Sequence, residues 1–249
     1  HGLNDDSSSE NRVWAFMKYA ATIALLITTS LFFYINFNSA QTDLVSDTQI
    51  LTIEKSSPAG KRSSIELKDG TRVILNQHSK ILFSTDFNEI DRRVEVVGEA
   101  FFDVKANAEK PFIVKTNNVY TTALGTSFNV RNMQSEKDIS ISLTEGSIVV
   151  SLDGPKYVAT EKSKLLFPGE EAIYTSDSKT MHNRDFDFKK VTGWKDNILY
   201  FKNMNALEVA KAIEDWYDVK VIFKNTPSTD WSFSGEFHNE TLNNVLEGL

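Results

Sequence analysis

The sequence of 249 residues has no cysteine, only four histidines and only five prolines. Without cysteine the chain can form no disulfide scaffold, no thiolate metal site and no cysteine nucleophile, although it fits either a reducing or an oxidising compartment. The histidines lie at positions 1, 78, 182 and 238, so none has a second histidine at the i, i+4 spacing of a helical zinc site. The sequence therefore predicts neither a metal ion nor a cofactor.

Positive charge is also scarce. The chain has 27 Lys and Arg against 34 Asp and Glu, which gives a formal net charge of -7. Nucleic-acid surfaces need a clustered excess of basic residues, so the charge predicts protein partners and no nucleic acid. The chain contains no glycine loop for phosphate and no G-x-S-x-G motif, and we predict that it is not a conventional enzyme. Its scattered carboxylates leave one alternative open, an exported hydrolase, because carboxylate separation is a property of the fold.

One long apolar run stands near the start of the chain. Residues 19–42 carry no charge, and Ile, Leu, Ala and Phe dominate their centre. About 20 such residues span a bilayer core as a helix, and Trp14 and Tyr34 lie where interfacial aromatic residues are expected. We predict a transmembrane helix over residues 13–37. A cleaved signal peptide is the alternative, but its apolar region is usually shorter.

The charges around this run predict its orientation. Arg12 and Lys18 precede it and Asp43 and Asp47 follow it. Positive charge stays on the inner side of a membrane, so everything after the run is expected to be exported. Residues 1–12 are polar and are interpreted as the remnant of a cytoplasmic linker.

The following region, residues 58–180, has the pattern of an all-β domain. Its apolar runs alternate with a period of two and are closed by turn pairs such as Asp69-Gly70 and Glu145-Gly146. About a dozen short strands predict a sandwich or a solenoid-like stack. Among them are strands at 80–85, 93–97, 100–104, 112–116, 118–124, 127–131, 162–167 and 170–174. Residues 43–57 and 181–197 are interpreted as linkers.

The pattern changes in residues 198–249, which predict a small α/β domain of order β-α-β-β-α. Asn205 and Glu208 form the capping box of an amphipathic helix that extends to Tyr217. The expected strands are 198–201 before this helix, and 219–223 and 230–237 after it. The last helix is expected over 239–249, and we interpret the domain as incomplete.

Several motifs in fixed order resemble the FecR family of anti-sigma factors. They are "GKRSSIELKDGTRVILNQHSKI", "VEVVGEAFFDV", "KPFIVKT" and "TALGTSFNVR", and the resemblance covers about residues 58–155. The segment from about 198 is similar to the short N-terminal domain of secretins and TonB-dependent proteins. Such an arrangement after one membrane helix is typical of the Bacteroidetes-type members.

The resemblance implies a function as a transmembrane signal transducer. A cytoplasmic domain absent from this sequence would hold an extracytoplasmic-function sigma factor. The exported part would contact the signalling domain of an outer-membrane TonB-dependent transporter, and site-specific membrane proteases would relay the signal by cutting the chain. The expected location is the inner membrane, with a single span, the N-terminus in the cytoplasm and the bulk of the chain in the periplasm.

The bond between Gly125 and Thr126 has two interpretations. In the first, the glycine is a bulge that lets Phe128 reach the core while Thr126 satisfies a sheet face. In the second, the Thr hydroxyl attacks the Gly carbonyl and a single self-cleavage follows, because some members of the family are cut at a Gly-Thr bond. The sequence leaves both open, and the fold interpretation needs fewer assumptions.

Partner contacts are expected at the sheet edges of the C-terminal domain. Strand addition to an open edge is a common recognition mode, and it points to Tyr200 and Phe201 or to Val221 and Phe223. The alternative is that these residues fill the core under the helix. A membrane-tethered carbohydrate-binding or envelope-structural module is a further alternative, for which Trp231 is the candidate platform.

Overall fold

The computed structural model describes residues 28–32 and 51–249, apart from residues 135, 153 and 229. The chain divides into two units, His1–Gln49 and Ile50–Leu249. Within the described part, no helix is both long and apolar enough to cross a membrane. The predicted transmembrane helix over 13–37 lies outside the described residues except for 28–32, which are helical.

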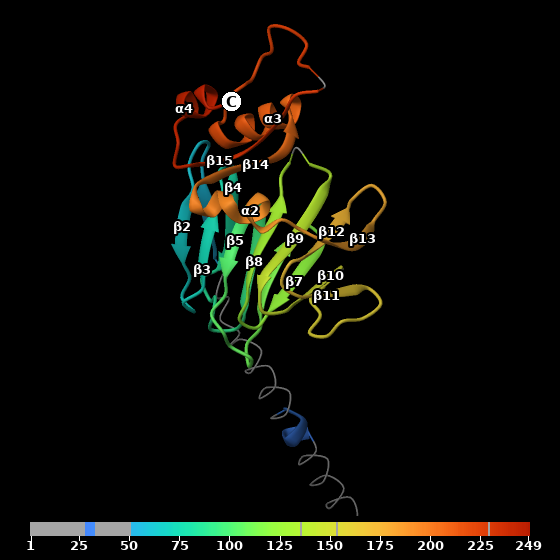
Figure 1. The fold of residues 1–249 in the computed structure, drawn as a ribbon. Coiled ribbons are helices and arrows are strands. Elements are labelled where there is room, and N and C mark those ends of the chain that lie inside the picture. Colours follow the sequence, from blue (N-terminus) through green and yellow to red (C-terminus); the bar gives the residue numbers. More distant parts are fainter. Residues whose placement is uncertain (1–27, 33–50, 135, 153, 229) are drawn as a thin grey trace, which may run out of the picture. The chain divides into compact units, whose positions relative to one another are not determined.

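Residues 52–185 form a single sheet of 13 strands, which confirms the mainly-β fold class (Figure 1). The strands are β1 Thr52–Ser57, β2 Ser63–Glu66, β3 Arg72–Leu75, β4 Ser79–Ser84, β5 Arg92–Asp103, β6 Phe112–Thr116, β7 Val119–Ala123, β8 Ser127–Asn132, β9 Asp138–Glu145, β10 Ile148–Leu152, β11 Ser163–Leu166, β12 Glu170–Thr175 and β13 Thr180–Asp185. The main path runs β11-β10-β7-β6-β5-β8-β9-β12-β13. We call these strands the β body.

Strand β5 connects the two layers of the β body. Its first half pairs with β4 and with β6, and its second half, from Gly98, pairs with β3 and β8. The separate strands expected at 93–97 and 100–104 are therefore one continuous strand. Gly98 has a φ of +92°, and a Cβ there would lie 2.8 Å from the Cα of Ser79. Glycine allows the strand to change layers where the backbones touch, so it bends the strand instead of ending it.

The first layer contains β1, β4, β6, β7, β10 and β11, and the second contains β2, β3, β8, β9, β12 and β13. Their inner faces enclose one apolar core. Three fully buried phenylalanines lie at its centre, where Phe102 stacks on Phe128 at 5.2 Å and packs against Phe112 at 5.8 Å between ring centroids. Burial of the apolar core, these rings included, is the main favourable term in the stability of the β body.

The segment 181–197, expected to be a linker, is largely ordered. It contributes β13, the helix α2 Phe188–Thr192 and the 3₁₀ turn η1 Gly193–Asp196. The sequence signal was weak because β13 is mostly exposed on both faces and α2 has only five residues. Asp187 caps α2, since its side chain accepts hydrogen bonds from the backbone N–H groups of Lys189 and Lys190.

The C-terminal unit, residues 198–249, has its own apolar core. It contains β14 Ile198–Asn205, α3 Ala206–Tyr217, β15 Ser232–His238 and α4 Leu242–Glu247. Asn205 and Glu208 form the predicted capping box, and Val209, Ala210 and Ile213 are buried. Leu207, three positions before the buried Ala210 on the helix, is 63% exposed.

The strand expected at 219–223 does not form, so the observed order is β-α-β-α. Asp218 ends α3 in the left-handed conformation. The backbone N–H of Val221 then donates to a carboxylate oxygen of Glu214, at 2.9 Å, and Lys220 pairs with the same carboxylate. A side chain of α3 thus satisfies a backbone donor that a strand partner would otherwise bind, and the apolar alternation of this segment was misleading.

Candidate functional site

The outer face of the second layer carries a buried polar row. Cross-strand pairing places Phe101, Asn129, Ser142, Glu171 and Arg184 next to one another on β5, β8, β9, β12 and β13. The middle three side chains are polar and at most 3% exposed. Burying polar groups is costly unless they are hydrogen-bonded, so this face is built differently from the apolar inner face.

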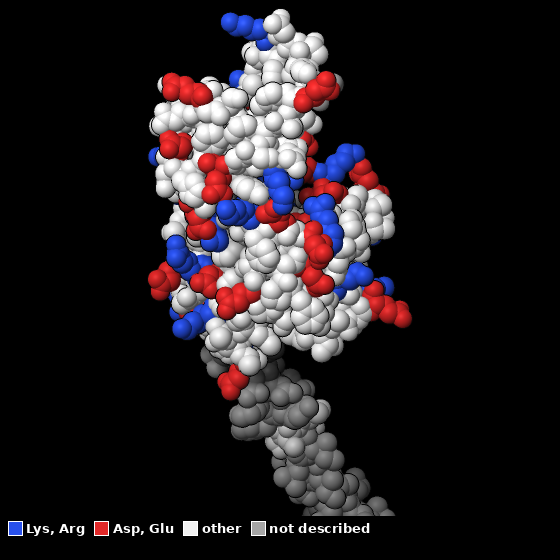
Figure 2. All heavy atoms as spheres, viewed as in Figure 1, with Lys and Arg blue, Asp and Glu red and all other residues white. Residues whose placement is uncertain are grey.

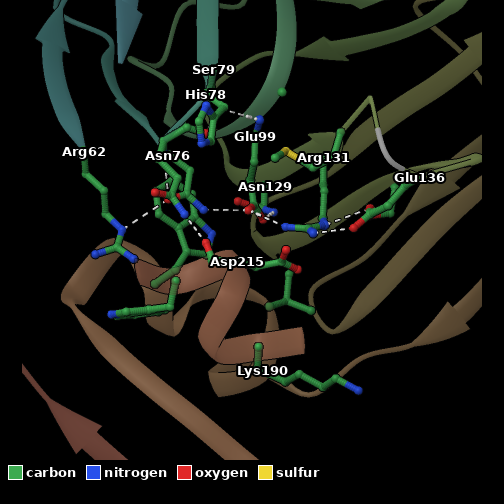
Figure 3. Close-up of a pocket in the computed structure, with 18 of the residues that line it drawn as sticks. Arg62, Asn76, His78, Ser79, Glu99, Asn129, Arg131, Glu136, Lys190 and Asp215 are labelled. Carbon is green, nitrogen blue, oxygen red and sulfur yellow. Dashed lines mark hydrogen bonds and ion pairs between the residues drawn. The ribbon is translucent and has the colours of Figure 1, made fainter. Parts of the chain in front are cut away.

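Glu99 is the centre of the hydrogen bonding on this face, as Figure 3 shows. Its carboxylate accepts from the amide nitrogens of Asn76 and Asn129, both at 2.9 Å, and from Arg131 Nη1 at 2.7 Å. Arg131 also binds Glu136 through two guanidinium nitrogens. Burial by itself lowers the pKa of Arg131, but the carboxylates of Glu99 and Glu136 more than offset this, and the pKa lies above its usual value.

Asn129 has only one orientation that fits this network. A carboxylate can only accept, so the amide nitrogen of Asn129 must face Glu99. Its oxygen Oδ1 is then buried with no hydrogen-bond partner in the described structure. A second buried group, the indole Nε1 of Trp194 in η1, is also without a partner there. One is an acceptor and the other a donor.

The buried carboxylate of Glu171 forms the other ion pair of this face, with Arg184, whose side chain is 61% exposed. It accepts from Ser142 Oγ and from Arg184 Nε, each at 2.8 Å. Both buried carboxylates of this face are therefore already neutralised by an arginine. Because both arginines are partly exposed to solvent, these pairs contribute less to stability than fully buried pairs would.

The C-terminal unit contacts the β body mainly through polar groups. Arg62 lies over the ring of Trp216, 4.0 Å from its centroid, and donates to Oδ1 of Asn197, the residue before this unit, at 2.9 Å. His78 Nε2 lies 3.0 Å from Asp218 Oδ1. Burial lowers the pKa of Arg62 below its usual value. The side-chain amide of Gln77 donates to the backbone carbonyl of Asp215.

Between these contacts lies a cleft of about 1240 Å³. It is lined by the outer face of the second layer, by α2 and η1, and by residues of β14 and α3 (Figure 3). Asn129 and Trp194 both line it. Figure 2 shows acidic and basic side chains interspersed over the visible surface, without a large area of one sign.

The aromatic rings of the cleft are partly covered by cations. Arg62 lies over Trp216, and Lys189 Nζ is 5.9 Å from the ring centroid of Tyr200. Trp194 is 6% exposed. Little open ring surface is left for a ligand that binds by stacking.

The predicted partner-binding residues do not form one surface. Tyr200 is half-buried and lines the cleft, whereas Phe201 is 1% exposed in the C-terminal core. Val221 packs against that core, and Phe223 is 40% exposed. The candidate platform Trp231 is half-buried and stacks on Phe233 at 6.2 Å, within the same C-terminal packing.

Gly125 and Thr126 lie outside the cleft lining, in the connection between β7 and β8. The chain passes there from the first layer to the second, and the pairing of β8 with β9 is shifted between Ser127 and Phe128. Gly125 has a φ of +153°, and a Cβ there would lie 2.7 Å from the Cα of Ala106. Thr126 is 5% exposed, and its hydroxyl has no partner in the described structure. The glycine therefore has a structural reason, a close backbone contact where the chain changes layers.

Sequence reasoning did not find Glu99, Asn129 or Glu171. The signal that would have found them is a polar residue inside a strand whose neighbours are apolar, as Glu99 is in "VVGEAFF". From the sequence alone such a residue is interpreted as solvent-exposed, because the sequence does not show which other element covers it. The described residues contain no group of three or more His, Cys, Asp or Glu that could hold a metal ion.

Comparison with known proteins shows the family. Residues 54–149 match the family described as FecR protein, and residues 198–249 match FecR, C-terminal. The chain belongs to the FecR family. Two crystal structures, at 2.50 Å and 1.65 Å resolution, of what is described as a "putative anti-sigma factor" from Parabacteroides distasonis ATCC 8503 resemble it, with TM-scores of 0.64 and 31% sequence identity.

The first of these comparisons covers 80% of this chain and 90% of the other, and the second covers 79% and 89%. The FecR family match runs from within β1 to within β10 and includes Phe101, Asn129 and Ser142 of the polar row, and the C-terminal match begins at β14. A search of the curated proteins found no match.

Proposed function

We propose that this FecR-family protein is a membrane-anchored anti-sigma factor that relays the state of an outer-membrane TonB-dependent transporter to an extracytoplasmic-function sigma factor. The observation that carries the proposal is the paired family match, FecR followed by FecR, C-terminal, together with the likeness to the Parabacteroides protein. A β body followed by a separately cored α/β unit is suited to contacts with another protein.

The proposed function requires that the chain is anchored in the inner membrane, with its N-terminus in the cytoplasm. The uncharged residues 19–42 and the charges on either side of them support this orientation. A reporter active only in the periplasm, fused after Leu249, should be active, and a reporter active only in the cytoplasm should be silent. An active cytoplasmic reporter and a silent periplasmic reporter would contradict the proposal.

Capture from envelope extract tests the partner. The full chain, purified in detergent, should retain the signalling domain of a TonB-dependent transporter. A matched panel of glycans, measured by calorimetry, is the control for the carbohydrate-binding alternative. Specific glycan binding without capture of a signalling domain would replace the proposed function.

We also propose one covalent step, a single-turnover self-cleavage at Gly125-Thr126. The hydroxyl oxygen of Thr126 would attack the carbonyl carbon of Gly125, and the hydroxyl proton would pass to the leaving nitrogen, so that an ester forms as the C–N bond breaks and the Thr126 amine is freed. Water would then hydrolyse the ester to give the Gly125 carboxylate and restore the Thr126 hydroxyl. The buried, unpartnered hydroxyl beside a glycine of unusual φ supports this step.

A further inference from the structure

Exposed apolar side chains gather at one end of the first layer of the β body. Strand pairing places the start of β1, the end of β4 and the start of β5 at this end, together with the start of β6, the end of β7, the start of β10 and the end of β11. We call this end the rim. Four large apolar side chains on it are between 48% and 72% exposed, namely Leu51, Ile90, Leu124 and Phe167. Apolar surface gathered in this way marks contact with a partner or a membrane.

The connection between β4 and β5, which carries Ile90, is held in place by contacts with the rest of the β body. Phe87 is 1% exposed and anchors the connection in the apolar core. Nζ of Lys110 donates to the backbone carbonyls of Asn88 and Glu89, at 2.8 Å and 3.1 Å. Ile90 is therefore presented outward on an ordered connection, where only something outside the β body can cover it.

Hydrogen bonds link the segments that carry these exposed side chains. The backbone carbonyl of Leu51 accepts from the N–H of Thr85, the first residue of the Ile90 connection, at 2.9 Å. The backbone carbonyl of Leu124 accepts from the N–H of Asn107 at 2.8 Å. Asn107 lies in the connection before β6, whose lysine binds the Ile90 connection. Leu51, Ile90 and Leu124 therefore lie on neighbouring segments of one surface.

The charges of the rim do not favour a strongly charged partner. Two exposed ion pairs, Lys68–Glu89 and Arg93–Asp91, lie within it, and the buried Arg92 pairs with Asp69. The charged residues on and beside its connections are of both signs, with acidic ones slightly in excess: Lys68, Asp69, Asp86, Glu89, Asp91, Arg92, Arg93, Asp103, Lys105, Glu109, Lys110 and Glu145. Anionic surfaces attract clusters of basic residues, which the rim does not offer. Contact is therefore expected through the apolar side chains and with little dependence on salt.

We propose that the rim rests on the surface of the membrane that anchors the chain, with Leu51, Ile90 and Leu124 at the boundary between lipid headgroups and acyl chains. The proposal rests on the proposed function, because it requires the anchor. Only residues 43–50 separate the uncharged run from Leu51, and eight residues span at most about 29 Å. Such a tether keeps the rim near the bilayer, so that a contact too weak to bind a free protein is sufficient.

This contact would set the direction in which the C-terminal unit faces. That unit lies at the end of the β body opposite the rim (Figure 1). Its contacts are with Arg62, Gln77 and His78, in the connections that follow β1 and precede β4. A β body that rests on its rim holds the C-terminal unit away from the lipid, where a protein partner can reach it.

The test uses the full chain in lipid nanodiscs of phosphatidylcholine, without any partner protein. Because the chain has no cysteine, Ile90→Cys, Leu124→Cys and Ile222→Cys each carry a single spin label. Ile222 is the matched control, since it is 82% exposed and belongs to the C-terminal unit. Oxygen concentrates in lipid and a nickel chelate stays in water. Labels at 90 and 124 should relax more with oxygen than with nickel, and the label at 222 should show the opposite.

A second measurement separates the effect of the label from that of the protein surface. The label stays at position 124, and Ile90→Ser removes a neighbouring apolar side chain that is exposed, so the fold should not change. Contact of the label with the nickel chelate should then rise about two- to tenfold, because less apolar surface holds the rim on the lipid. Ile222→Ser, the same change at a similarly exposed position of the C-terminal unit, should leave this contact unchanged.

The proposal is overturned if labels at 90 and 124 meet the nickel chelate as readily as the label at 222, or if Ile90→Ser has no more effect than Ile222→Ser. In that case the relay stands, provided that the periplasmic reporter is active. If the labels lie in lipid but no signalling domain is captured from envelope extract, the relay is wrong and the membrane contact stands. A chain that does not enter nanodiscs has no anchor, and both proposals are then wrong.

Discussion

Gly125 packs so closely on Ala106 that a side chain at this position would collide with backbone atoms. This steric constraint acts on a single residue. The sequence identified Gly125 as unusual but did not show that a close backbone contact is the cause. The alternation of "TALGTSFNV" suggested a bulge inside a strand. The structure places the glycine between two strands, where the chain changes layers, and the shift in pairing follows at Ser127.

We expect Gly125→Ala to lower the free energy of unfolding by about 2–4 kcal/mol, from a close contact with backbone together with an unfavourable φ. Gly60→Ala is the matched control, because Gly60 also has a positive φ, of +66°, but nothing lies within 4 Å of a Cβ there. It should cost only about 1 kcal/mol. Urea unfolding of the two variants measures the difference, and equal losses would contradict a steric role for Gly125.

Thr126 allows the covalent step to be tested by itself. Thr126→Val keeps the shape of the side chain and removes a buried hydroxyl that has no partner, so stability should be unchanged or slightly higher. If the chain cleaves itself, mass spectrometry finds a new N-terminus at Thr126 in the wild type and in Thr126→Ser, and none in Thr126→Val. An intact wild type, or equal cleavage of the Val variant, would leave the Gly-Thr pair with its structural role alone.

Short elements at the junction depend on a few side chains. The helix α2 has five residues and no buried side chain, so packing contributes little to it. Asp187 caps its first turn and also binds Lys202 Nζ of β14 at 2.7 Å. The hydrogen bond from Lys202 is the main cause that holds the pKa of Asp187 below its usual value of 3.8.

The lowered pKa gives a pH dependence of known sign. The carboxylate stabilises the fold fully above pH 3.8, the ordinary value, and this contribution is lost as the pH falls through the lower pKa of the folded state. At neutral pH we expect Asp187→Ala to cost about 1 kcal/mol, since it removes a cap. Urea unfolding between pH 7 and pH 2.5 should show this difference shrinking in the acid range.

Asp187→Asn is the control for this prediction. Asparagine caps helices about as well as aspartate, so the variant should lose only the exposed ion pair with Lys202 and should be close to wild type at neutral pH. A difference between wild type and Asp187→Ala that persists unchanged at pH 2.5 would exclude a role for the ionised carboxylate.

At the scale of the whole molecule, the described residues form two cores that share no residue, one in the β body and one in the C-terminal unit. The polar contacts between them include Arg62, Gln77 and His78 on one side and Asp215, Trp216 and Asp218 on the other. Polar contacts of this kind contribute less to stability than an apolar interface of similar size, because each replaces contacts with water.

We therefore expect deletion of residues 198–249 to leave the β body folded. Its far-UV circular dichroism should remain that of a β protein, and its unfolding temperature should fall by only about 2–8 °C, which corresponds to a loss of one or two kcal/mol in a domain of this size. Binding to the signalling domain should be lost in the same variant. Retained binding would move the contact to the β body, and an unfolded product would show that the two cores depend on each other.

The sequence by itself determined the class of the fold, the hairpin strands, the capped helix α3 and the family. These features depend on local signals: alternation of apolar residues, turn pairs such as Asp69-Gly70, and the Asn205–Glu208 box. Only the tertiary structure decided that β5 is one strand, that 219–223 is not a strand, and that Glu99, Asn129 and Glu171 are buried. Each of these depends on which distant segment lies against the strand. The sequence does not show whether a polar side chain is covered by water or by another part of the protein.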